Sequence, residues 1–518
     1  MNAGEEIPCG ETAPPAGDHG RLGGYDIASR TQSLVGLREV EDQVRADLER
    51  IAEQYPDAVP EGVRKDHQRT YDLYYRVRTH EKAHFYQGLS TATELARTFA
   101  ENDLTRFLFT TLEAVPPGQD LWLPLLRWAY GAAPGCPPQL TSVISRFRTA
   151  DIVYAALDGD AEAADRDPGR VRAFFPAASR PLAADPGFRL GRRYLAEGAA
   201  KAAEWIYVLR SEPEALLRAE SDLASSPEVY RRAILHVRQL IPEVPLPGQL
   251  QAVVLCADFA LNPEVPVELW PDIYAAEAAD AARLAPGPRF VLVSRLLPGI
   301  PAACFAAKEN LAAELTSRVS DMLGWPGPDQ ATRAAVAAID GVLASSQHAR
   351  LLALLPGSDH PIRRLRMALE ARLEDTWAFV PPVNASLINA RRLAPSGFRG
   401  STLTPTGEID RLLTPERTWF TGRLARQLIY AQCPECPLRS DSSYQTEFTA
   451  DEACPELSSG RCAQAHSRGA IRHEFLACRI TGNLLEHHLG SGWSARLRFF
   501  VGGEDPGAFR PGANRPRF

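Results

Sequence analysis

The stretch RTHEKAHFYQ, residues 78–87, carries two histidines, His80 and His84, four positions apart. Residues at i and i+4 share one face of a helix, so both imidazoles can reach a single metal ion. The intervening Glu81 lies about 100° round the helix, where its carboxylate can reach a metal-bound water. Gln87 continues the histidine stripe. This spacing predicts a metal site, although a salt-bridged, solvent-exposed helix face would give a similarly charged pattern.

A second stretch, YLAEGAAKAAE at residues 194–204, offers the ligand that the first one lacks. A catalytic zinc ion needs three protein ligands and an open position, and two histidines plus one carboxylate are a common set. The first helix has no further acid or histidine within reach, so the third ligand must come from another helix. Glu197 is followed by Gly198 and by alanines, and these small residues predict a close approach of this helix to the first.

Together the two motifs resemble the gluzincin branch of the zinc metallopeptidases. The resemblance covers roughly residues 60–210 and implies a zincin-like core in which His80, His84 and Glu197 bind catalytic Zn²⁺ and Glu81 is the general base. It also implies that Glu204, seven residues after the third ligand, supports a ligand histidine from behind. Gln87 is a second candidate for such outer support. The chain departs from the family pattern at Arg78 and Lys82, where uncharged residues are usual.

These residues lead us to expect a zinc metallopeptidase that cleaves peptide bonds by Glu-assisted attack of zinc-bound water on a protein or peptide substrate. A further donor should stabilise the oxyanion, and Tyr207, Tyr230 and His236 are candidates. Two alternatives stay open. The chain could be a non-catalytic helical scaffold, or a pseudo-peptidase that binds a protein partner in its former cleft.

The remaining pattern predicts a mainly α (α+β) protein. Residues 1–29 should form a disordered acidic, Pro/Gly-rich tail, 30–240 the catalytic region with an insertion at 101–190, 241–380 a helical region, and 381–518 a Cys-bearing module. Apolar spacing predicts helices over 37–51, 61–97 with a bend near Gly88, 191–209, 213–221, 229–241, 250–260, 309–323, 330–344 and 361–374. Short helices are expected in 101–190, and a strand at 171–175.

A second metal site is possible near the C-terminus. Cys433 and Cys436 form a Cys-x-x-Cys pair, and Cys454 and Cys462 could complete a structural Zn²⁺ site. Redox-active thiols, an iron–sulfur cluster and unbound thiols are the alternatives. His473, His487 and His488 are expected to be ordinary surface or core histidines, since Cys478 lies five positions after His473, a poor angle for sharing a metal. Cys136, Cys256 and Cys304 are expected to be small buried hydrophobic residues.

Composition sets limits on function and location. The chain has 518 residues, 45% hydrophobic and 23% charged, with a net charge of −7, which is usual for a folded protein. An acidic chain is a poor candidate for nucleic-acid binding. No apolar run approaches the roughly 18–20 residues of a membrane span. Residues 1–18 lack the pattern of a secretory signal, and nine cysteines do not suggest a disulfide framework, so we expect a cytoplasmic location.

Overall fold

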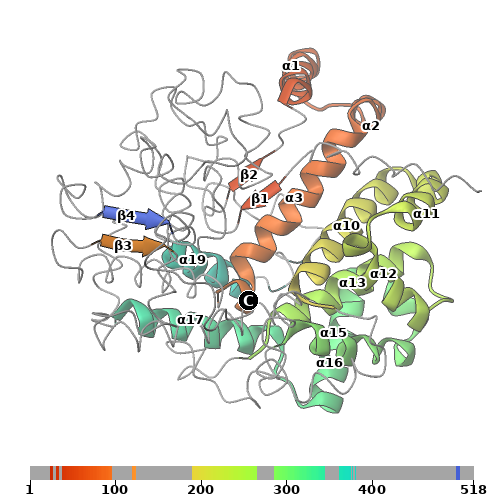
Figure 1. The fold of residues 1–518 in the computed structure, drawn as a ribbon. Coiled ribbons are helices and arrows are strands. Elements are labelled where there is room, and N and C mark those ends of the chain that lie inside the picture. Colours follow the sequence, from red (N-terminus) through yellow and green to blue (C-terminus); the bar gives the residue numbers. More distant parts are fainter. Residues whose placement is uncertain are drawn as a thin grey trace, which may run out of the picture.

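The computed structural model describes residues 24–26, 31–33, 38–95, 120–123, 190–264, 285–344, 361–374, 376, 380 and 498–501. This part of the chain is mainly α, as expected (Figure 1). Among its helices, none combines the length and the apolar character that crossing a bilayer requires.

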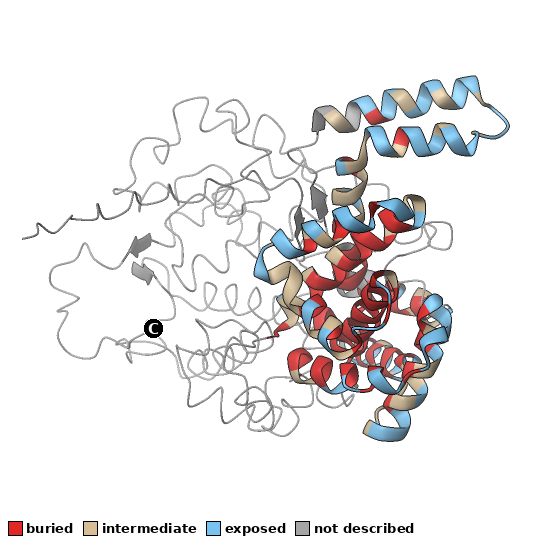
Figure 2. Ribbon diagram, turned by 90° about the vertical axis from the view of Figure 1, so that its right-hand side faces the viewer, coloured by how far each residue is buried: buried red, intermediate tan, exposed pale blue. Residues whose placement is uncertain are grey.

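The N-terminal helices are α1 (Arg38–Gln54), α2 (Glu61–Thr70) and α3 (Asp72–Ser90). The interruption that we expected near Gly88 lies just beyond it, and a further one precedes α3. Gly88 is inside α3, and the helical run is interrupted at Tyr71, between α2 and α3, and at the extended residue Thr91. Most residues of α1 and α2 are exposed, and Figure 2 shows these helices projecting from the more buried body. Helices α1 and α3 share a small buried contact, formed by Val44 and Tyr74.

Helix α10 (Arg192–Ser211) packs antiparallel against α3 and forms the second wall of the candidate site. The contact between the two helices is lined by Ala83 of α3 and by Ala200 and Ala203 of α10, all buried. Alanine has a short side chain and the highest helix propensity, so an alanine-rich face both forms a helix and lets its axis come close to a neighbour. The small residues thus bring the two motifs together, as the sequence predicted.

Gly198 has a different neighbour from the expected one. A Cβ added there would lie 2.9 Å from Cβ of Ala233 on α12 (Glu228–Leu240), and 3.6 Å from the carbonyl oxygen of Tyr230. The glycine therefore permits the approach of α12, whereas the approach to α3 depends on the alanines. This close packing also brings Tyr230 beside the candidate site.

The core is centred on α13 (Leu246–Leu261), which packs against α10 and α12. Nearly all of its residues are buried, as expected for a helix that is apolar on every side. One continuous apolar cluster includes residues of α10, α12 and α13, so a single core spans the boundary that we predicted between residues 240 and 241. Cys256 is fully buried, as expected, whereas Cys304 is only partly buried and packs against the cluster. Burial raises the pKa of the Cys256 thiol.

Most other helices lie close to their predicted ranges. The structure has η2 (Pro213–Ala215), α11 (Leu216–Ser225), α16 (Lys308–Leu323), α17 (Pro328–Ala344) and α19 (Pro361–Glu374). It also has α15 (Pro286–Ser294), η4 (Leu297–Gly299) and η5 (Ala302–Ala306), which we did not predict. Helix α15 begins with a proline, and in the first turn of a helix proline leaves no hydrogen bond unmade.

Helix α19 docks on α3 through a buried arginine. The side chain of Arg372 is 1% exposed and donates a hydrogen bond of 3.0 Å to the carbonyl oxygen of Ser90, the last residue of α3. It also forms an ion pair with Asp258 of α13. Asp258, the single charge in an apolar stretch, is thus neutralised by a residue 114 positions away, and three helices meet at this pair.

Four short strands complete the described part. Strand β1 (Gly24–Asp26) pairs antiparallel with β2 (Thr31–Ser33), so part of the predicted disordered tail is a strand. Strand β3 (Asp120–Leu123) pairs in parallel with β4 (Arg498–Val501), which joins the 101–190 insertion to the Cys-bearing module. The strand predicted at 171–175 lies outside the described residues.

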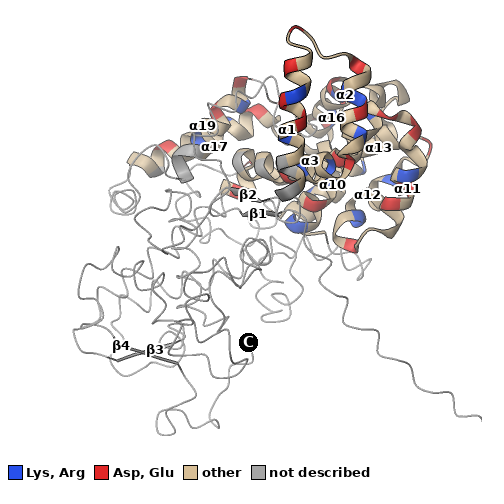
Figure 3. Cartoon of the chain, turned by 90° about the horizontal axis from the view of Figure 1, so that it is seen from above, with Lys and Arg blue, Asp and Glu red and all other residues tan. Residues whose placement is uncertain are grey.

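Charges of both signs are present on most of the described helices (Figure 3). Several form pairs one helical turn apart, such as Glu314 with Arg318 at 2.8 Å. Pairs of this kind contribute well under about 1 kcal/mol each when exposed. A different arrangement is found between α3 and α10, where charged side chains are buried.

Candidate metal centre

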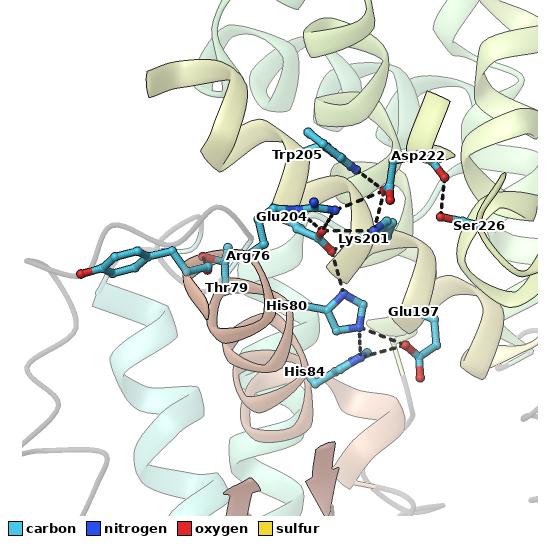
Figure 4. A network of polar contacts seen from close by, with 11 residues as sticks. Arg76, Thr79, His80, His84, Glu197, Lys201, Glu204, Trp205, Asp222 and Ser226 are labelled. Carbon is cyan, nitrogen blue, oxygen red and sulfur yellow. Dashed lines mark hydrogen bonds and ion pairs between the residues drawn. The ribbon is translucent and has the colours of Figure 1, made fainter. Parts of the chain in front are cut away.

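The three predicted ligand residues converge between α3 and α10 (Figure 4). Nε2 of His80 lies 3.2 Å from Oε2 of Glu197, and Nε2 of His84 lies 3.0 Å from the same oxygen. The two Nε2 atoms are 3.1 Å apart. Three potential ligand atoms thus form a nearly equilateral triangle, although His84 and Glu197 are 113 residues apart in the sequence.

This triangle has the size that a metal ion requires. Zinc binds histidine nitrogen and carboxylate oxygen at about 2.0–2.2 Å, and tetrahedral angles then place neighbouring ligand atoms about 3.3–3.6 Å apart. The observed separations of 3.0–3.2 Å are a few tenths of an ångström shorter than this range. Within the described residues, this is the one group of three or more His, Cys, Asp or Glu side chains with such a spacing. The residues therefore fit a tetrahedral metal.

Glu204 stands behind His80, as expected. Its Oε2 lies 3.6 Å from Nδ1 of His80, on the opposite side of the imidazole from Glu197. A carboxylate in this position favours the tautomer with the proton on Nδ1 and leaves the Nε2 lone pair for a metal. The carboxylate of Glu204 thus lies on the side of His80 that faces away from the other candidate ligands.

The electrostatics of the cluster reflect burial and close pairing. Burial alone would lower the pKa of His80, but the neighbouring carboxylates of Glu197 and Glu204 outweigh it and raise the pKa to about 10. Burial opposes ionisation of Glu204, yet His80, Lys201 and Arg76 lower its pKa to about 2. The pKa of Glu197 is likewise well below its usual value, because the two histidines outweigh the effect of burial. Both carboxylates are therefore ionised at neutral pH.

A cavity of about 230 Å³ opens beside the three ligands. Its lining includes Glu81, which is 6% exposed, and Gln87, one turn beyond His84 on α3. The placement of Glu81 beside the ligands and on the cavity wall agrees with the spacing argument. Gln87 is buried and faces the cavity as well as following the ligand stripe.

Tyr230 is the cavity-lining member of the three oxyanion candidates. Its ring lies 5.6 Å from the ring of His80, centroid to centroid. The hydroxyl of Tyr207 instead accepts a hydrogen bond of 2.9 Å from Nε2 of Gln68. Nε2 of His236 pairs with the hydroxyl of Ser294 at 2.9 Å. Of the three, Tyr230 is thus the residue that lies beside the candidate ligands.

His236 makes a contribution to stability that depends on pH. Burial, with a smaller effect of Arg295, lowers its pKa to about 4, whereas an unfolded histidine has a pKa near 6.5. The neutral form is favoured by folding, so stability is full above pH 6.5 and falls as the pH drops toward 4. Between pH 7 and pH 5, wild type should lose up to about 2 kcal/mol more than His236→Gln in urea unfolding. Equal losses would contradict this role.

The structure also reveals charged residues that the sequence did not single out. Arg192, at the start of α10, lines the cavity and pairs with the buried Glu94 at 2.6 Å. Arg76, which resembled part of a solvent-exposed face, is 15% exposed and pairs with Glu204. It lies one turn before His80 on the same stripe, and this spacing is the signal that could have revealed it. Arg78 is exposed, and burial lowers the pKa of the half-buried Lys82.

The predicted C-terminal site falls outside the described residues, with Cys433, Cys436, Cys454 and Cys462. The same is true of Cys136, His473, Cys478, His487 and His488. Comparisons of the chain with protein-family models, with curated proteins and with solved structures found no match.

Proposed function

We propose that this protein is a zinc-dependent hydrolase, and specifically a peptidase that acts on peptide or protein substrates. The observation that carries the proposal is the triangle of His80, His84 and Glu197 beside a cavity lined by Glu81. Two histidines, one carboxylate and an adjacent acid are the set that metal-assisted hydrolysis needs.

The chain supplies each role in this chemistry from a named residue. His80, His84 and Glu197 would hold the metal, which when bound supplies a Lewis acid that activates water and polarises the substrate carbonyl. Glu81 accepts the proton of the attacking water and passes it to the leaving amine. The hydroxyl of Tyr230 donates a hydrogen bond to the developing oxyanion.

Glu81 favours hydrolysis over other uses of the same donor set. Two histidines and one carboxylate also suit iron(II), so metal analysis should include both metals. A carboxylate on the cavity wall next to the ligands serves a hydrolase directly, because the reaction must move a proton from water to the leaving group. A scaffold or a non-catalytic binder has no such requirement.

The substitution Glu81→Gln tests the proposal. We expect it to retain about one zinc per chain, because residue 81 is not a ligand. Cleavage of a proteome-derived peptide mixture should fall by about 10²–10⁴-fold, because the amide cannot accept the proton. Metal content by mass spectrometry and peptide products by liquid chromatography measure the two effects.

The exposed residue Glu214 provides the control, since Glu214→Gln should change neither quantity. If wild type binds zinc but cleaves no more than Glu81→Gln, the protein is a pseudo-peptidase that binds a partner. If wild type binds no metal, the scaffold alternative is favoured.

A further inference from the structure

Behind the candidate metal centre, four charged side chains form a connected network (Figure 4). Arg76 of α3 donates from Nε to Oε1 of Glu204 at 2.7 Å. Lys201 of α10 contacts both oxygens of Glu204, at 3.1 and 3.2 Å. Asp222 of α11 contacts both cations, at 3.3 Å from Arg76 and 2.7 Å from Lys201. The network therefore joins three helices.

The network is held in place by an aromatic ring. Nε1 of Trp205, which is fully buried, donates a hydrogen bond of 2.7 Å to Asp222. The guanidinium of Arg76 lies over the same ring, 4.2 Å from its centroid. The cation and its acidic partner are thus both fixed by one rigid side chain in the core.

The burial of these charges needs an explanation other than stability. The side chains of Arg76, Lys201 and Glu204 are 15%, 12% and 7% exposed. Removing charges from water costs several kcal/mol per ion, and buried ion pairs are often no more stabilising than apolar residues of the same size. The two cations and the two carboxylates balance each other. The net charge of these four side chains is thus zero.

The network orients Glu204 toward His80. With Oε1 held by Arg76 and Lys201, and Oε2 held by Lys201, the carboxylate of Glu204 cannot rotate without breaking these contacts. Oε2 is thereby fixed 3.6 Å from Nδ1 of His80. An imidazole oriented from behind presents its Nε2 atom in one direction.

We propose that Arg76 and Lys201 are positioning residues, which hold Glu204 so that His80 is aligned for a metal ion. This inference rests on the proposed function, because it requires His80 to be a ligand. The proposal adds Arg76 and Lys201 to the site, although both act through Glu204 and not on a candidate ligand directly. Asp222 and Trp205 hold the two cations in turn.

Whether removal of Arg76 strengthens or weakens metal binding distinguishes a positioning role from a purely electrostatic one. If Arg76 acted on the site only through its charge, its removal would strengthen the binding of a divalent cation, because one repulsion would be lost. If Arg76 orients Glu204, its removal frees the carboxylate and weakens binding. Loss of outer partners of a metal ligand typically costs 10–100-fold in affinity.

The test is the affinity of the full chain for Zn²⁺ and for Co²⁺, each added alone in competition with a chromogenic chelator. We expect Arg76→Met and Lys201→Met each to weaken Zn²⁺ binding about 10-fold. The Co²⁺ absorption spectrum should also change, because it reports ligand geometry. Methionine keeps much of the apolar length of both side chains, and circular dichroism checks the fold.

Arg238→Met is the matched control. Arg238 of α12 pairs with Glu220 of α11 at 2.7 Å, so this variant breaks an Arg–carboxylate pair on the same helix as Asp222. It should leave the affinity and the spectrum unchanged. Arg76→Lys keeps the positive charge but loses the planar guanidinium with its several N–H donors. We expect this variant to bind Zn²⁺ about 3-fold more weakly than wild type.

Unchanged or tighter binding by folded Arg76→Met and Lys201→Met would overturn the inference and leave the proposed function intact. Wild-type affinity in Arg76→Lys would have the same meaning should Arg76→Met fail to fold. Absence of metal binding by wild type itself would overturn both.

Discussion

Replacing Glu197 by alanine should abolish tight metal binding. Glu197 supplies one of the three atoms of the ligand triangle, and its Oε2 is within 3.0–3.2 Å of both imidazole nitrogens. Without it, two histidines one turn apart remain, and a metal held by these alone would exchange readily. We expect the zinc content of purified protein after mild chelation to fall from about one ion per chain to near zero, an affinity loss of more than about 100-fold.

Glu197 and Glu212 lie on and just beyond the same helix, α10, which makes Glu212→Ala a suitable control. This variant should keep its zinc, because Glu212 pairs with Arg69 and not with the histidines. His80→Ala should behave like Glu197→Ala. A zinc content in Glu197→Ala equal to that of wild type would show that the third ligand lies elsewhere.

The second large effect concerns stability. Arg372→Met should lower the free energy of unfolding by about 3–5 kcal/mol, because Asp258 would remain as a buried charge without its partner. Ser90 would also lose a hydrogen bond at the end of α3. Denaturant unfolding followed by circular dichroism measures the change.

Arg366→Met provides a comparison on the same helix. Arg366 pairs with Asp340 at the surface, with side chains 33% and 50% exposed, so its loss should cost less than about 1 kcal/mol. The double variant Asp258→Asn/Arg372→Met should regain part of the stability lost by Arg372→Met, because the uncompensated charge is removed. Equal costs at Arg366 and Arg372 would contradict the importance of burial.

Much of the candidate site follows from local spacing. The stripe of His80, His84 and Gln87 could be predicted because helical geometry fixes which residues share a face. Predicting Glu197 as a ligand required more than spacing, because no local rule connects it with His84. The prediction rests on the number of ligands that a metal site needs and on the small residues that follow Glu197. Helix α10 has nearly the predicted ends, whereas the segment predicted over 61–97 is divided into α2 and α3.

The rest depends on tertiary contacts that spacing does not encode. The position of Arg76 on the ligand stripe is visible in the sequence, but its burial depends on Glu204 and Asp222, which belong to other helices. The sequence predicts that Gly198 allows a close approach to α3, whereas the packing shows that its close neighbour is α12. The choice of Tyr230 over Tyr207 and His236 has the same origin.

The candidate ligands come from two helices that are far apart in the sequence, and this affects how stably those helices stay docked. A metal ion at the triangle would be held only while α3 and α10 are docked, because each helix supplies part of the site. By mass action, an ion at 100 times its dissociation constant favours the docked state by about 2.7 kcal/mol. The concentration of free metal ion would thus set how often α3 and α10 separate. A chelator would weaken their docking without breaking a covalent bond.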